Sequence, residues 1–204
     1  MAARLLKHLF APSAARLFPA DVLQRIAGAV AAGEARHRGE ICFAVEAALP
    51  ARAVLAGHAA RDRAREAFAQ LRVWDTVANN GVLLYLLLAD HRIEIVADRG
   101  LDALVSAEQW RGVCQLMEER LRAGEAEAAV LQGVAAVSDL LAEHFPRAPG
   151  AADENELPDL PRVFLTGKPG PERARFFIIL FNPGGAKRAS EGVTAQRAGG
   201  AAPS

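Results

Sequence analysis

The chain has 204 residues and no net charge, because 24 lysine and arginine residues balance 24 aspartate and glutamate residues. A neutral chain lacks the basic excess that non-specific nucleic-acid binding needs, so we expect no nucleic-acid partner. The same balance of charge argues that the chain is not a polybasic membrane-surface protein. The length favours one domain with extensions, and a hydrophobic content of 51% is typical of a globular chain rich in helices.

Residues 1–19 predict an amino-terminal helix followed by a linker. The basic side chains lie away from one face of this helix. That face carries four apolar side chains: Leu5, Leu6, Leu9 and Phe10. We interpret the segment as a helix that docks on the domain, with a membrane-surface anchor as the alternative. It lacks the uninterrupted apolar block of a signal peptide, and no segment reaches the roughly 18 apolar residues of a membrane helix.

The two cysteines, Cys42 and Cys114, are isolated and show no metal-binding spacing. Two such thiols are typical of buried, reduced cysteines in a reducing compartment. Together with the lack of a signal peptide or a transmembrane segment, this favours a cytoplasmic protein.

Residues 20–146 predict a single α/β domain. Its first elements are a helix over 20–32 that ends at Gly33, and a strand over 40–47. We expect Glu46 in this strand to face solvent, with a rare buried carboxylate as the alternative. A helix over 55–72 follows. Its charged residues predict a solvated side: Arg61, Asp62, Arg63, Arg65 and Glu66.

The most informative stretch is 79–100, with the sequence NNGVLLYLLLADHRIEIVADRG. A buried strand over 82–88 and a half-exposed strand over 92–96 form a predicted β-hairpin, the first strand central and the second nearer an edge. The elements over 40–88 have the length of a βαβ unit, which predicts that the strands over 40–47 and 82–88 are parallel.

The rest of the domain is predicted to be helical. We expect one helical turn over 101–104, a helix from a capping box at Ser106 to about Arg122, and a last helix over 125–144. The predicted fold class is therefore α/β: a three-layer α/β/α sandwich with a small mixed sheet that contains the β-hairpin.

Residues 147–204 predict a tail that is rich in proline and glycine and largely disordered. Its apolar block, FFIILF at 176–181, is too short to span a bilayer. We can assign it no function; it could pack on the domain as an added strand.

Four oxygen-bearing residues are predicted to meet at one end of the sheet: Glu40, Asp75, Asn80 and Asp98. If the strands run as predicted, the start of the first strand, the start of the second and the end of the third share this edge. Oxygen ligands suit Ca²⁺ or Mg²⁺, so the cluster is our candidate metal site, and Asp102 could also reach it. The simpler interpretation is that Asn79 and Asn80 form a turn and that Asp98 caps the next helical turn.

Two further features bear on function. Ligands of parallel sheets usually bind at the opposite end, which here means near Pro50, Asp90 and His91. The five histidines lack metal-binding spacing, so we expect them at surface or capping positions.

The order of these elements resembles the TPM domain family, named after a thylakoid lumen protein, a photosystem II repair protein and a worm receptor modulator. The resemblance rests on GEICFAVEAALP, on NNGVLLYLLLADHRIEIVADRGLD and on the last helix, GVAAVSDLLAEHFP, and covers roughly residues 20–145. It implies an α/β/α sandwich and divalent-metal binding by acidic loop residues. A plant member is described as an acid phosphatase, and other members act as accessory modules on membrane complexes.

We therefore carry two hypotheses about function. The first is a binding or accessory module with a protein partner, such as a membrane-associated complex, and with a divalent cation as a further ligand. The second is a metal-dependent phosphatase in which Glu40, Asp75 and Asp98 hold a cation that polarises a phosphoryl oxygen. The second requires these carboxylates to converge in space.

Overall fold

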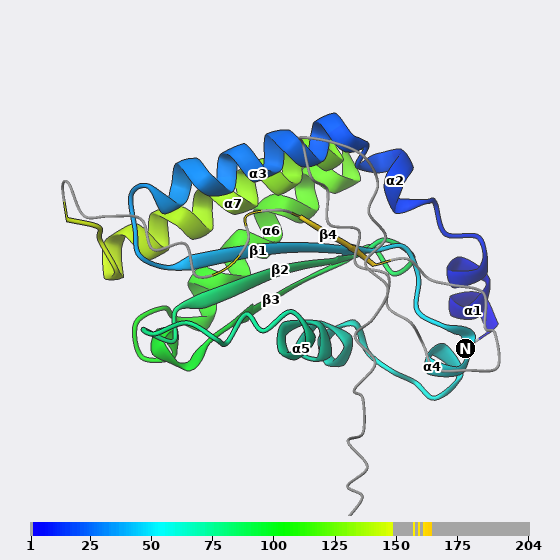
Figure 1. Cartoon of the computed structure of the whole chain (residues 1–204). Coiled ribbons are helices and arrows are strands. Elements are labelled where there is room, and N and C mark those ends of the chain that lie inside the picture. The colour runs from blue at the N-terminus through cyan, green and yellow to red at the C-terminus, as the bar shows by residue number, and fades with distance from the viewer. Residues whose placement is uncertain (1, 149–156, 158, 160, 165–204) are drawn as a thin grey trace, which may run out of the picture.

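The computed structural model describes residues 2–148, 157, 159 and 161–164. The elements follow one another in this order: α1 (Ala2–Leu9), α2 (Ala14–Leu17), α3 (Ala20–Glu34), β1 (Glu40–Glu46), α4 (Ala51–Leu55), α5 (Ala60–Gln70), β2 (Gly81–Leu87), β3 (Arg92–Ala97), the 3₁₀ turn η1 (Arg99–Leu101), α6 (Ala107–Arg122), α7 (Ala126–His144) and β4 (Arg162–Phe164). Figure 1 shows a twisted sheet with helices above and below it.

The sheet has four strands in the order β3-β2-β1-β4. β1 is parallel to β2, with Glu40 opposite Gly81, and β2 is antiparallel to β3, with Val82 opposite Ala97. These pairings confirm the predicted β-hairpin and the predicted parallel pair. They also place β2 in the centre and β3 at an edge.

The two faces of the sheet have separate apolar cores, because successive side chains of a strand point to opposite sides. Ile41 and Phe43 of β1 pack with α3, α6 and α7, whereas Cys42 and Ala44 pack with α4 and α5. Helices therefore cover both faces (Figure 1), and the predicted three-layer α/β/α sandwich is confirmed.

Two helices differ from the prediction. α3 continues through Gly33 to Glu34, and the helix expected over 55–72 begins only at Ala60, as α5, after a break that separates it from the short helix α4. The break falls at Gly57, whose φ of +78° lies in the left-handed region that glycine adopts at little cost. By contrast, the capping box of α6 is present as predicted, since Ser106 and Gln109 bind each other's backbone amides.

One strand comes from the segment predicted to be a tail. β4 lies parallel to β1, with Ala44 opposite Arg162 and Glu46 opposite Phe164, and forms the second edge of the sheet. The apolar block at 176–181 lies outside the described residues. Within the described residues, no helix is both long enough and apolar enough to cross a membrane.

Candidate functional site

Three of the four predicted metal ligands lie at one end of the strands, which we call the amino-end rim: Glu40 at the start of β1, Asn80 before β2, and Asp98 after β3. The register brings Glu40 level with Gly81, and the amide of Asp98 donates to the carbonyl of Gly81 at 2.9 Å. Asp75 lies in the preceding loop, where it is exposed and binds Arg72 at 2.8 Å. The topology therefore places three of the four predicted residues at the rim.

Each of these residues has a structural role. The Asn80 side-chain amide donates to the Arg38 carbonyl at 2.9 Å, and Glu40 Oε2 accepts from the Leu157 amide at 3.2 Å. Asp98 Oδ1 accepts from the Arg99 amide at 2.8 Å and thereby caps η1. These bonds match the simpler interpretation of turn and cap chemistry.

Two oxygens at the rim nevertheless lack a hydrogen-bond donor among the described residues: Asn80 Oδ1 and Asp98 Oδ2. Both atoms are buried, and Asn80 as a whole is fully buried. Buried acceptors of this kind normally bind water or an ion. Within the described part of the chain, however, no three histidine, cysteine, aspartate or glutamate side chains are grouped so that they could hold a metal ion.

A further carboxyl lies close behind the rim. Glu34, at the end of α3, is buried and accepts from the Ile41 amide at 2.9 Å. Burial, followed by the nearby charges of Glu40 and Asp159, raises the pKa of Glu34 to about 8. The sequence analysis missed this residue, because nothing in a helical pattern distinguishes a buried last-turn glutamate from an exposed one.

The loop over 71–79 borders the rim and is held firmly. Asn79 adopts a φ of +52°, its side-chain oxygen accepts from Arg99 at 3.0 Å, and its carbonyl accepts from the Gly100 amide at 2.9 Å. A β-carbon at Gly100 would lie 2.5 Å from that carbonyl, so only glycine fits there. The loop presents Trp74, 46% exposed, and Val77, 90% exposed, to solvent.

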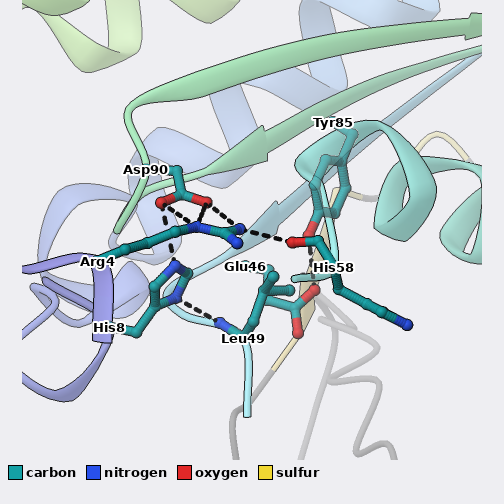
Figure 2. Close-up of polar contacts among 7 residues, drawn as sticks. All are labelled: Arg4, His8, Glu46, Leu49, His58, Tyr85 and Asp90. Carbon is teal, nitrogen blue, oxygen red and sulfur yellow. Dashed lines mark hydrogen bonds and ion pairs between the residues drawn. The ribbon is translucent and has the colours of Figure 1, made fainter. Parts of the chain in front are cut away.

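The opposite edge, the carboxyl-end rim, is closed by a polar cluster that fixes α1 (Figure 2). Arg4 binds both carboxylate oxygens of Asp90 and donates to the His58 carbonyl at 2.7 Å. His8 lies between Asp90 and the Leu49 amide, at 3.1 and 2.9 Å. The Leu49 amide can only donate, so His8 Nδ1 accepts and its Nε2 proton is directed at Asp90.

This arrangement occupies both ring nitrogens of His8, which therefore has no lone pair left to act as a base. The Arg4 guanidinium and the imidazole of His8 hold the pKa of Asp90 below its usual value, against the opposing effect of burial. A pocket of about 200 Å³ lies nearby, lined by Leu86, Leu88 and His91 among others. It is smaller than most ligand pockets, which measure roughly 300–1,000 Å³.

A buried ion pair lies on the α5 side of the sheet. Arg63 donates to Glu46 at 2.8 Å, and the Tyr85 hydroxyl donates to the same oxygen at 2.7 Å. Burial and the Glu46 carboxylate raise the pKa of Tyr85, so its proton stays in place. The prediction that Glu46 faces solvent is wrong, because Arg63 and Tyr85 supply the partners that a buried carboxylate needs.

Two predictions about which side chains are exposed to solvent also need correction. Arg63 is not on a solvated side of its helix but is 4% exposed. Its spacing from Ala60, Ala64 and Ala67 places it on the buried stripe, which is a signal that the sequence does carry. Two of the histidines expected at surface or capping positions, His8 and His37, are buried.

The structure places the chain among the α/β proteins, as an open α/β/α sandwich with a four-stranded mixed sheet and a polar amino-end rim. The model of the TPM domain matches residues 13–140, and the chain belongs to the TPM domain family. The structure is also similar to the NMR structure of the BA42 protein from the psychrophilic bacterium Bizionia argentinensis. The two are 25% identical with a TM-score of 0.63, over 72% of this chain and 94% of that one. None of the curated proteins matches the chain.

Proposed function

We propose that this chain is a TPM-domain binding module and that its amino-end rim contacts a protein partner. The observation that carries the proposal is the firmly held loop over 71–79, which exposes Trp74 and Val77 beside Asn80 and Asp98. Exposed aromatic side chains on a rigid backbone are efficient anchors in protein interfaces, because little conformational entropy is lost when they are buried. Membrane-associated complexes are among the partners that the family resemblance suggests.

The proposal includes weak binding of Ca²⁺ or Mg²⁺ at the rim. Asn80 and Asp98 each offer an oxygen of the type that such a cation prefers, since hard cations bind carboxylate and amide oxygens. Glu40 and Asp75 fit less well, because they already bind the Leu157 amide and Arg72. Two protein oxygens leave most of the coordination sphere to water or to the partner, and this is why we expect weak binding.

A metal-dependent phosphatase is the second candidate, and the same two unpaired oxygens favour it. A cation held there would polarise a phosphoryl oxygen. That chemistry needs several carboxylates around one point, whereas Asp98 is the only carboxylate at the rim with an oxygen that the described residues leave without a donor. We therefore prefer the binding module.

The first test is a titration of the protein with Ca²⁺ and Mg²⁺, followed by thermal unfolding and by the amide signals of residues 75–102. A ligand of the native state raises stability by mass action. We expect a saturable shift that is lost in Asp98→Ala and retained in Glu119→Ala, a control on an exposed carboxylate of α6. No shift at millimolar metal would remove the cation from the proposal.

A parallel assay separates the two functions. Phosphate release from a simple phosphomonoester is measured with and without the metals, in the native chain and in Asp98→Ala. The binding module predicts no release above background. Metal-dependent release that disappears in Asp98→Ala would establish the phosphatase instead.

The partner contact is tested by a photo-reactive residue introduced at Val77 in cells, with Leu116 on α6 as the matched exposed control. One discrete adduct at position 77 that is absent at position 116 is the expected result. Adducts of equal pattern at both positions would contradict a specific contact on the loop.

We also propose that the protein is cytoplasmic. Cys42 and Cys114 are both free, which supports this location.

A further inference from the structure

Helix α1 is attached to the domain by its polar side. Arg4 and His8 point toward Asp90 and bind it (Figure 2). Leu5 packs against the apolar core on the α4 and α5 face of the sheet. Leu9 and Phe10 face solvent instead. A helix on a soluble domain normally buries its apolar stripe and exposes its charges, so the orientation of α1 is the reverse of the usual one.

The exposed side chains form a continuous surface. Leu6, Leu9 and Phe10 are 54, 61 and 80% exposed, and positions separated by three and four residues are neighbours on a helix. α4 packs against α1 and adds Leu55, which is 56% exposed. Figure 1 shows the two helices side by side at the carboxyl end of the sheet.

The exposed charges that α1 and α4 themselves contribute to this surface are basic, although the whole chain is neutral. Residues 2–10 and 50–58 contain no aspartate or glutamate, and Lys7 and Arg52 are exposed there. The charge of Arg4 is matched by Asp90. A second copy related by a two-fold axis would place this basic surface against an identical basic surface, which disfavours self-association through it.

We propose that α1 and α4 form a docking surface for an anionic lipid bilayer, on which Leu6, Leu9 and Phe10 insert at the level of the headgroups. Lys7 and Arg52 would then lie near lipid phosphates, which attract them. The surface is separate from the amino-end rim, so this contact goes beyond the proposed protein partner. α1 precedes residue 13, where the match to the TPM domain begins, so this helix is an addition to the matched domain, whereas α4 lies within the match.

The test uses the full chain and sedimentation with vesicles of phosphatidylglycerol and phosphatidylcholine, compared with vesicles of phosphatidylcholine alone. We expect binding to the anionic vesicles that weakens as salt is added. The double variant Leu9→Ser, Phe10→Ser should bind about tenfold less tightly or weaker still, since two inserted side chains are lost. Leu116→Ser, which changes an exposed leucine on α6, should bind as the native chain does.

A charge variant keeps the test independent of folding. Lys7→Glu leaves the apolar side chains in place and should weaken binding to anionic vesicles. Absence of sedimentation with the anionic vesicles, or equal sedimentation of the native chain and the double variant, would overturn the proposal. So would a concentration-dependent dimer that the double variant abolishes, because the surface would then bind a second copy. None of these results bears on the amino-end rim, which is tested through Asp98 and Val77.

Discussion

The two ends of the sheet use polar side chains in opposite ways. At the carboxyl-end rim, Asp90 receives hydrogen bonds from Arg4 and His8, so its charge is matched by the protein itself. At the amino-end rim, Asn80 and Asp98 each keep one buried oxygen without a donor among the described residues. Ligands of parallel sheets usually bind at the carboxyl end. Here that end is occupied by the protein's own side chains, and the unmet polarity lies at the other end.

The largest effect is expected from the buried ion pair on the carboxyl-end half of the sheet. Arg63→Ala would leave Glu46 buried without its cation, and loss of one partner of such a pair costs about 3–5 kcal/mol. Urea unfolding of Arg63→Ala is compared with that of Arg65→Ala, which changes a solvated arginine on the same helix. If Arg63→Ala lowers the free energy of unfolding by less than Arg65→Ala does, the buried carboxylate of Glu46 does not depend on Arg63.

A pH effect is expected at the amino-end rim. Glu34 has a pKa of about 8 in the folded chain and about 4.3 when unfolded, so the folded state binds the extra proton between these values. Stability therefore falls as pH rises through this window, by at most about 1.4 kcal/mol per pH unit. Glu34→Gln should flatten the profile between pH 7 and 8 (roughly the upper part of the window), whereas Glu119→Gln, an exposed control, should not.

Below neutral pH, a second group opposes this trend. Burial lowers the pKa of His37 to about 4, whereas an unfolded histidine titrates near pH 6.5. The unfolded chain then binds the extra proton, so this contribution to stability rises with pH between about 4 and 6.5. The two contributions offset each other there, and a fall in stability due to Glu34 alone is expected only above that range.

A smaller effect is expected for the cluster that holds α1. Asp90→Ala removes the acceptor shared by Arg4 and His8 and should cost about 1–3 kcal/mol. Hydrogen exchange should accelerate in residues 2–9 and remain unchanged in α7. Because the pKa of Asp90 is lowered by folding, its contribution is present above the unfolded value and disappears as pH falls below about 4. Unchanged exchange in α1 would show that Leu5 alone anchors the helix.

The smallest effect is expected from Asp98→Ala in the absence of metal. The substitution removes the cap of the single turn η1, and capping side chains contribute about 0.5–2 kcal/mol. It also removes a buried oxygen that has no donor, which offsets part of the loss. Thermal unfolding should thus place Asp98→Ala above Asp90→Ala in stability. The reverse order would contradict the contrast between the two ends of the sheet.

The parts of the fold that sequence patterns predicted are those fixed by local spacing. The alternation over 79–100 predicted the hairpin, and Ser106 with Gln109 predicted the start of α6. The missed features depend on distant partners. Arg4 meets Asp90 across 86 positions of the chain, and no local pattern could reveal that contact. Glu40, Asn80 and Asp98 lie at the expected end of the strands and Asp75 does not, and the hydrogen bonds of Asn80 to Arg38 and of Glu40 to Leu157 could not be foreseen from local patterns.

The pairing of β4 with β1 has a consequence for any shortened form of this protein. β1 is a fully buried strand, and among the described residues its outer edge pairs only with residues 162–164, well beyond the end of the match to the TPM domain at residue 140. A chain cut at that boundary would present the unpaired backbone of β1 to other molecules, and such edges template aggregation. During synthesis, likewise, the sheet stays open on this side until Phe164 has been added.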